Sequence, residues 1–218
     1  MAVDYNDRMR LLLFAVALAL NLLGTPVMAT EEPAFSVVFK HGEFEVRDYP
    51  PLVVAEIAVT GSRTEAAGKG FRLLAGYIFG DNTRRQKIAM TAPVIQSPAG
   101  ETIAMTAPVL QTGGDGTWTI RFIMPRGAML DTLPRPNNPK VHLHAKAAAR
   151  VAVVRFSGLA RQDDVAAKTL ALSRFVTTQR LQATGSASLA QYDPPWTPWF
   201  MRRNEMMIPV ARAVEEGK

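Results

Sequence analysis

The chain has 218 residues, a mean hydropathy of +0.03 and a formal net charge of +6 at pH 7, which is typical of a globular protein large enough for one domain with its own core. It contains no cysteine, which excludes disulfide bonds, zinc ribbons, iron–sulfur clusters and thiolate nucleophiles together. The basic residues are scattered along the sequence, so we interpret the positive charge as a solvated surface.

The N-terminal segment has the pattern of an export signal. Arg8 and Arg10 precede an apolar run over residues 11–20, and Val27-Met28-Ala29 resembles a signal peptidase site. The alternative is an uncleaved anchor, although the run is short for about 30 Å of hydrocarbon. We therefore predict a cleaved signal peptide or an anchor over residues 1–29, and a periplasmic or secreted domain over residues 30–218. Outside the cytoplasm no nucleic-acid partner is expected, and a membrane is expected only if the segment stays uncleaved.

After a short linker, the next segment alternates apolar and charged residues with the period of a half-buried strand. The pattern predicts strands over residues 36–40 and 43–47, joined by His41-Gly42, and a longer strand over residues 52–60.

Ser62-Arg63-Thr64-Glu65 has the spacing of a capping box, which predicts that a helix follows. Gly80-Asp81-Asn82 is expected to end this helix. Residues spaced at i, i+3, i+4 and i+7 give it one apolar face: Phe71, Leu74, Ala75 and Ile78.

The sequence I-A-M-T-A-P-V occurs twice, beginning at Ile88 and at Ile103. Each copy is expected to form a short strand, over residues 87–96 and 102–111. A proline within each strand indicates an edge or a bulge. Met90 and Met105 offer soft, adaptable apolar surface, which serves either core packing or the wall of an apolar ligand groove.

Further strands are predicted over residues 117–124, 141–145, 150–156, 188–192 and 205–210, with a proline-rich loop over residues 125–139. Asp163 and Asp164 favour the start of a second helix, and Gly185 is expected near its end. The two halves then share a β-α-β-β order. This predicts an α+β fold, a twisted antiparallel β-sheet or barrel from two pseudo-repeats with two flanking helices. A cleft between helices and sheet would be the natural ligand site.

The sequence carries no G-x-S-x-G, H-E-x-x-H or phosphate-binding glycine loop, and we expect no enzyme. His142 and His144 point to one face of a strand and could bind a metal, but no third ligand is apparent, so we interpret them as a polar face. His41 is interpreted as a hairpin residue and also considered as a heme ligand.

A third motif, Y-D-P-P-W-T-P-W-F-M-R-R-N-E, spans residues 192–205. Three prolines stiffen this loop, and aromatic residues lie along it. Arg202, Arg203 and Glu205 form either a structural ion-pair network or a site that meets a ligand carboxylate.

Three segments together resemble the SOUL heme-binding family: F-E-V-R-D-Y-P from Phe44, K-I-A-M-T-A-P-V from Lys87, and the motif of residues 192–205. I-M-P from Ile123 and R-F-S-G from Arg155 also fit. The resemblance covers residues 36–212. It implies a twisted β-barrel of two β-α-β-β repeats with two helices, which binds heme or another tetrapyrrole in an apolar groove, without an established catalytic role. We expect the protein to be a monomer.

In that family the first helix lines the groove, which implies a site on the helical face given above, and we add Met90, Met105 and His41 as candidates. Some members have a histidine where this chain has Asp48, so no axial ligand is assigned. Heme is then held without a histidine, or His41 or a methionine substitutes, or the ligand is not heme. The alternatives are an envelope module that binds a lipid or peptide, and an unrecognised enzyme.

Overall fold

The computed structural model describes residues 30–98 and 116–211. Residues Glu31–Lys218 form one compact unit. Within the described residues the elements are β1 (Ser36–His41), β2 (Phe44–Tyr49), β3 (Leu52–Thr60), α2 (Arg63–Ile78), β4 (Val94–Pro98), β5 (Thr117–Ile123), β6 (His142–Lys146), β7 (Ala149–Ser157), α3 (Gln162–Thr178), β8 (Ser188–Gln191), the 3-10 helix η1 (Trp199–Met201) and β9 (Arg203–Val210).

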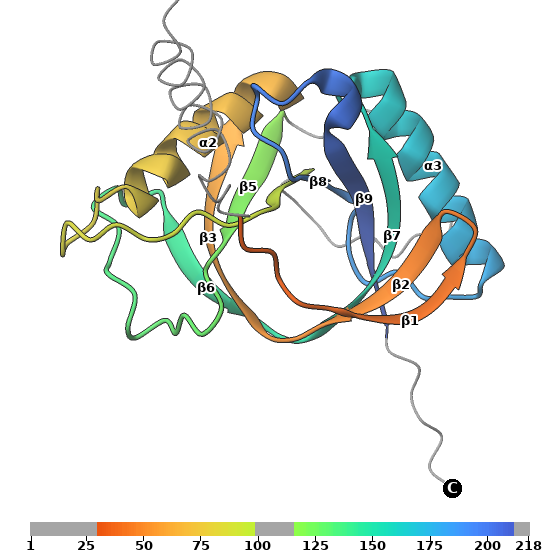
Figure 1. The fold of residues 1–218 in the computed structure, drawn as a ribbon, viewed down its shortest axis with the longest axis horizontal. Coiled ribbons are helices and arrows are strands. Elements are labelled where there is room, and N and C mark those ends of the chain that lie inside the picture. Colours follow the sequence, from red (N-terminus) through yellow and green to blue (C-terminus); the bar gives the residue numbers. More distant parts are fainter. Residues whose placement is uncertain (1–29, 99–115, 212–218) are drawn as a thin grey trace, which may run out of the picture. The chain divides into compact units, whose positions relative to one another are not determined.

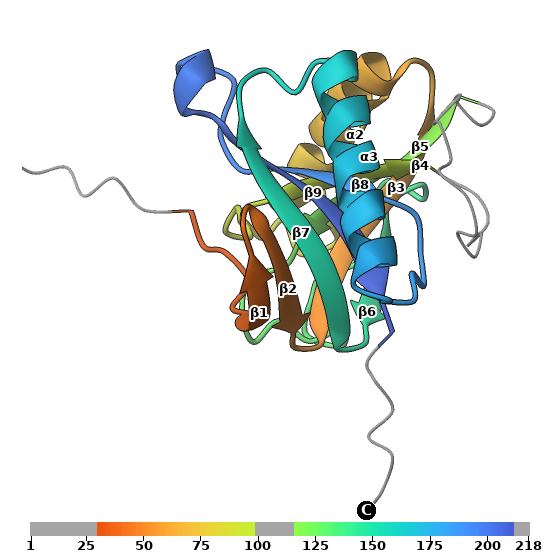
Figure 2. The same cartoon turned by 90° about the vertical axis from the view of Figure 1, so that its right-hand side faces the viewer.

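The strands form a nine-stranded sheet in the order β1-β2-β7-β9-β8-β4-β5-β3-β6, and every pairing is antiparallel. The sheet curls, and both helices lie on its outer side (Figure 1). Helix α2 packs on β3 and β5, and α3 packs on β7 and β9, as the turned view also shows for α3 (Figure 2). The predicted α+β fold, a twisted antiparallel sheet with two flanking helices, is confirmed.

Two pseudo-repeats meet at the centre of this sheet, where Ile95 of β4 pairs with Ala190 of β8. Each repeat has the order β-α-β-β, as β3-α2-β4-β5 and β7-α3-β8-β9. Among the described residues, the last two strands of the first repeat are β4, which begins at Val94 in the first copy of I-A-M-T-A-P-V, and β5. Each repeat is also preceded by a strand that joins the other one: β2 pairs with β7, and β6 pairs with β3.

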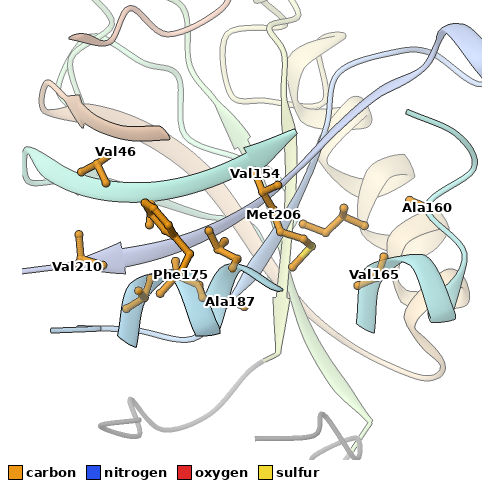
Figure 3. Packing of buried hydrophobic residues seen from close by; sticks show 13 residues of the cluster. Val46, Val154, Ala160, Val165, Phe175, Ala187, Met206 and Val210 are labelled. Atoms are coloured by element: carbon orange, nitrogen blue, oxygen red, sulfur yellow. The ribbon is translucent and has the colours of Figure 1, made fainter. Parts of the chain in front are cut away.

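The main cores lie between the helices and the outer face of the sheet. Under α3, the ring of Phe175 stacks on Phe44 at 4.7 Å between centroids, and Leu172 is fully buried in the same core cluster. Phe175 lies in this cluster with Val46 of β2 and Met206 of β9 (Figure 3). Under α2, Leu74 and Ile78 are buried among side chains of β3 and β5. Because burial of apolar area is the main stabilising term, these layers fix the helices on the sheet.

The capping box predicted for α2 is confirmed. The Ser62 hydroxyl accepts from the Glu65 amide at 3.3 Å, and the Glu65 carboxylate accepts from the Ser62 amide at 3.0 Å. Helix α3 begins with Asp163 and Asp164 in its first turn, as expected. It ends at Thr178, well before Gly185, which lies against the ring of Pro209 instead.

The first copy of the doubled motif forms less strand than predicted, because β4 begins only at Val94. The preceding residues form a loop that is tied to the end of α2. The Asn82 amide donates to the Tyr77 and Gln86 carbonyls at 3.0 and 2.7 Å, and the Ile88 amide donates to Ile78. Pro93 has no amide to offer a neighbouring strand. The second copy lies outside the described residues.

Candidate functional site

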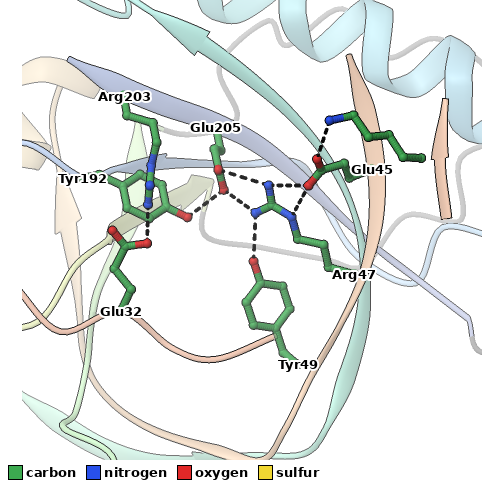
Figure 4. A network of polar contacts seen from close by, with 8 residues as sticks. Glu32, Glu45, Arg47, Tyr49, Tyr192, Arg203 and Glu205 are labelled. Carbon is green, nitrogen blue, oxygen red and sulfur yellow. Dashed lines mark hydrogen bonds and ion pairs between the residues drawn. The ribbon is translucent and has the colours of Figure 1, made fainter. Parts of the chain in front are cut away.

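The inner face of the sheet, turned away from the helices, carries a buried polar network (Figure 4). Arg47 of β2 donates to Glu205 of β9 through both terminal nitrogens, at 2.9 and 3.3 Å. The Tyr192 hydroxyl donates to the same carboxylate at 2.6 Å, and Arg47 also contacts the Tyr49 hydroxyl at 3.3 Å and Glu45 at 2.8 Å. Strand alternation places Arg47 inward, since its neighbour Val46 belongs to the core under α3. Two motifs that lie 158 residues apart thus form one cluster.

Burial and charge set the protonation of this network. Burial alone would lower the pKa of Arg47, but its hydrogen bonds to Glu205 and Tyr49 raise that pKa above its ordinary value. Burial and the nearby Glu205 charge raise the pKa of Tyr192, and burial raises the pKa of Tyr49. At neutral pH the cluster therefore holds a compensated ion pair between two neutral phenols. Because the Glu205 carboxylate already accepts hydrogen bonds from the Arg47 guanidinium and the Tyr192 hydroxyl, we interpret the network as structural.

A second, more exposed cluster occupies the related place in the other half of the sheet. Arg121 lies opposite Ile95 in β4, as Glu205 lies opposite Ala190 in β8. Arg121 donates to Glu56 at 2.7 Å. Burial would raise the pKa of Glu56, but the hydrogen bond and charge of Arg121 lower that pKa below its usual value.

The histidines do not assemble a metal site. His142 and His144 share a face of β6 with ring centroids 6.2 Å apart, and His144 lies 3.3 Å from Glu56. Both are exposed, which agrees with a polar face. In the described ranges, no group of three or more histidine, aspartate or glutamate side chains could hold a metal ion.

Residues 31–35, which we call the strap, run from the first half of the sheet to β1 (Figure 1). The Ala92 amide donates to the Glu31 carbonyl at 2.9 Å, and Glu32 pairs with Arg203 (Figure 4). Phe35 lies 5.4 Å from the Tyr49 ring between centroids, with the Arg47 guanidinium 4.2 Å from its own centroid. The segment that the sequence presented as a linker is therefore bonded to both halves and covers the buried network.

A cavity of about 540 Å³ lies between the strap, the turn from β2 to β3 and the loop after β5. Its walls are mainly apolar, with Glu31, Glu32, Thr91 and Arg126 as polar members. The lining residues are Glu31, Glu32, Pro33, Ala34, Pro50, Pro51, Leu52, Val53, Thr91, Ile123, Met124, Pro125, Arg126, Gly127, Ala128, Met129, Leu130 and Ala145.

None of the predicted site residues that the structure describes lines this cavity. Four of them form the face of α2 toward the sheet, where Leu74, Ala75 and Ile78 are buried and Phe71 packs edge-on against Phe122. Met90 packs on the same core, and His41 is exposed at the end of β1. Met105 lies outside the described residues.

The sequence interpretation missed Arg126, Met129 and Leu130, because it treated residues 125–139 only as a loop, and it placed Met124 only at the end of a strand. The signal available was the I-M-P motif from Ile123, which forms part of the cavity wall. Thr91, from the first copy of the doubled motif, also lines the cavity.

The fold is a two-repeat antiparallel half-barrel with a buried polar network on its inner face and an apolar cavity beside the strap. The chain belongs to the SOUL heme-binding protein family, whose model matches residues 30–209. A search of curated proteins found no match. No helix in the described part of the chain is long and apolar enough to cross a membrane.

Solved structures show the same fold at low sequence identity. The C-terminal domain of EcmrR aligns with a TM-score of 0.56 and 12% identity, covering 78% of this chain and 97% of that one. EcmrR in its DNA complex aligns with a TM-score of 0.57 and 11% identity, covering 95% of this chain and 67% of that one. Sequence identities this low support a shared fold and nothing about function.

Proposed function

We propose that the chain binds heme or a related tetrapyrrole in the cavity beneath the strap, outside the cytoplasm, for carriage or buffering. The observation that carries this proposal is the apolar cavity of about 540 Å³ in a member of the SOUL heme-binding family. Binding is favoured over catalysis because the buried carboxylate of the inner face, Glu205, is already bonded to Arg47 and Tyr192.

The cavity suits an apolar macrocycle with acidic substituents. Its volume lies in the range of about 300–1,000 Å³ found for small-molecule sites. Apolar side chains, among them Met124 and Leu130, would cover the ring faces. The Arg126 side chain is 73% exposed at the rim and forms a long ion pair of 3.9 Å with Glu31, which a ligand carboxylate could replace.

No histidine reaches the cavity, since the three in the chain lie on β1 and β6. Heme, when bound, supplies a redox-active iron, and the soft donors that line the cavity are the thioethers of Met124 and Met129. We therefore expect metal-free protoporphyrin to bind about as tightly as hemin, and His41→Ala to leave the hemin spectrum unchanged.

The test is a hemin titration of residues 30–218, followed by the Soret band. We expect a shift that saturates at one equivalent and a Leu130→Glu variant that binds at least about tenfold more weakly, because it places a charge in an apolar wall. Leu170→Glu is the matched control, since Leu170 of α3 is 39% exposed and Leu130 is 42% exposed. A wild-type protein that gives no shift but takes up fatty acid or peptide would contradict the tetrapyrrole proposal. An unchanged affinity in Leu130→Glu would place the site elsewhere, with the α2 face as the remaining candidate.

A further inference from the structure

The loop between β8 and β9, residues 193–202, exposes four large apolar side chains together. Trp196 is 83% exposed, Trp199 61%, Phe200 62% and Met201 64%. Single exposed apolar residues are normal on a protein surface, whereas a contiguous group of this size marks an interaction site. We call this segment the aromatic loop. None of its residues lines the cavity.

Hydrogen bonds within the loop hold its aromatic side chains in exposed positions. Arg202 donates to the Thr197 carbonyl at 2.8 Å and also to the Pro195 carbonyl. The Met201 amide donates to the Pro198 carbonyl at 2.9 Å. At the base, the Asp193 carboxylate accepts from the Arg203 amide at 2.5 Å. The loop is thus held in one shape with its aromatic side chains outward, so little conformational entropy remains to be lost when they are buried.

These bonds also prepare the loop for an apolar medium. A backbone carbonyl that enters a bilayer without a partner costs several kcal/mol, and Arg202 satisfies two carbonyls of the loop itself. Tryptophan favours the boundary between lipid headgroups and acyl chains, where its ring is apolar and its N–H stays hydrated. A bilayer surface therefore fits this loop.

A second, independent observation concerns where the strap is held. Glu32 pairs with Arg203, the first residue of β9 and the residue directly after the aromatic loop. The segment before residue 30 carries the apolar run predicted to pass through, or stay in, a membrane. The chain thus enters the described domain at the base of the aromatic loop. The net charge of +6 further favours a surface of the opposite sign.

We propose that the aromatic loop docks the domain on an anionic phospholipid bilayer, with Trp196, Trp199 and Phe200 at the level of the headgroups. The proposal does not depend on tetrapyrrole binding. Docking by the aromatic loop would also bring the strap to the membrane surface, because Glu32 of the strap is paired with Arg203 at the end of the loop.

The test uses residues 30–218, since every buried core cluster lies between Val46 and Val210. The protein is mixed with vesicles of phosphatidylglycerol and phosphatidylcholine, and separately with phosphatidylcholine alone. Co-sedimentation and tryptophan emission report binding. Two of the three tryptophans lie in the loop, and the third, Trp118, is held by a hydrogen bond to the Gly61 carbonyl. We expect a blue shift and co-sedimentation with the anionic vesicles.

The double variant Trp196→Ala/Trp199→Ala should lose at least about tenfold in partitioning, because each ring carries a large apolar area. Its circular dichroism should be unchanged, since both side chains are exposed. Phe79→Ala is the matched control, because Phe79 is 61% exposed at the end of α2 and should leave partitioning unchanged.

Three results would overturn the proposal. The first is an absence of binding to anionic vesicles by folded protein, and the second is equal binding by the double variant. The third is a dimer in sedimentation velocity that the double variant abolishes without lipid, which would assign the loop to a contact between copies of the chain. Equal binding to phosphatidylcholine alone would overturn the requirement for anionic lipid.

Discussion

Removal of Arg47 should destabilise the protein strongly because it leaves the Glu205 carboxylate buried without its cation. In Arg47→Met the aliphatic stem is kept and only the guanidinium is lost. The side chains of Arg47 and Glu205 are 7% and 3% exposed, and the bond between them is bidentate. Breaking a buried pair from one side costs about 3–5 kcal/mol. The Tyr192 hydroxyl still donates to Glu205, so we expect about 3 kcal/mol.

For a domain of this size, that loss corresponds to about 6–12 °C in Tm. Urea unfolding followed by tryptophan fluorescence gives the free energy of unfolding directly. The double variant Arg47→Met/Glu205→Leu should be more stable than Arg47→Met alone, because it also removes the buried charge.

Lys168→Met is the control. Lys168 lies only 2.6 Å from Glu43, nearer than Arg47 lies to Glu205, but these side chains are 28% and 50% exposed. An exposed pair contributes about 0.2–1 kcal/mol. If Lys168→Met costs as much as Arg47→Met, or if the double variant is the least stable of the set, burial does not govern these pairs and the reasoning is refuted.

Two further predictions concern helix packing and alkaline pH. In urea unfolding, Gly70→Ala should destabilise the protein by about 1–3 kcal/mol, because the new Cβ would lie 2.4 Å from Ile120. Gly68→Ala should instead stabilise it by up to about 1 kcal/mol, because its Cβ would meet only Arg72, at 3.6 Å. All three tyrosines of residues 30–218 have a raised pKa, and burial raises that of Tyr77 to about 12. The absorbance of tyrosinate at 295 nm should therefore stay low at pH 10 until the protein unfolds. The neutral tyrosines stabilise the folded protein below their ordinary pKa of 10.0, and this stabilisation is lost as the pH rises above that value. A rise in absorbance near pH 10 in protein that is still folded would contradict the prediction.

Local patterns predicted most of the secondary structure. The S-x-x-E spacing at Ser62 places the start of α2 correctly because a capping box acts within four residues. The start of α3 follows equally well from Asp163 and Asp164. The doubled motif was harder, because its first copy is governed by the Asn82 side chain, whose hydrogen bonds tie it to the end of α2.

The site was less predictable, because its parts come from distant segments. Arg47 and Glu205 each stood in a recognised motif, but only the pairing of β2, β7 and β9 brings them within hydrogen-bonding distance. The face of α2 was assigned to a ligand because an apolar stripe looks alike whether it meets a core or a groove, and Leu74 meets the core. The cavity depends on the strap, whose position no periodicity encodes.

The exchange of β2 and β6 between the two repeats makes the halves interdependent. A fragment that ends after β5 would leave β2 without β7, and would leave the edge of β3 that pairs with β6 exposed. The remaining fragment would lack the partners of β6 and β7 in turn. Each half supplies the strand that the other lacks, as in a domain-swapped dimer joined into one chain. A cut in the loop of residues 125–139 should therefore give two pieces that fold only when mixed, which makes this loop the place to divide the protein for fragment complementation.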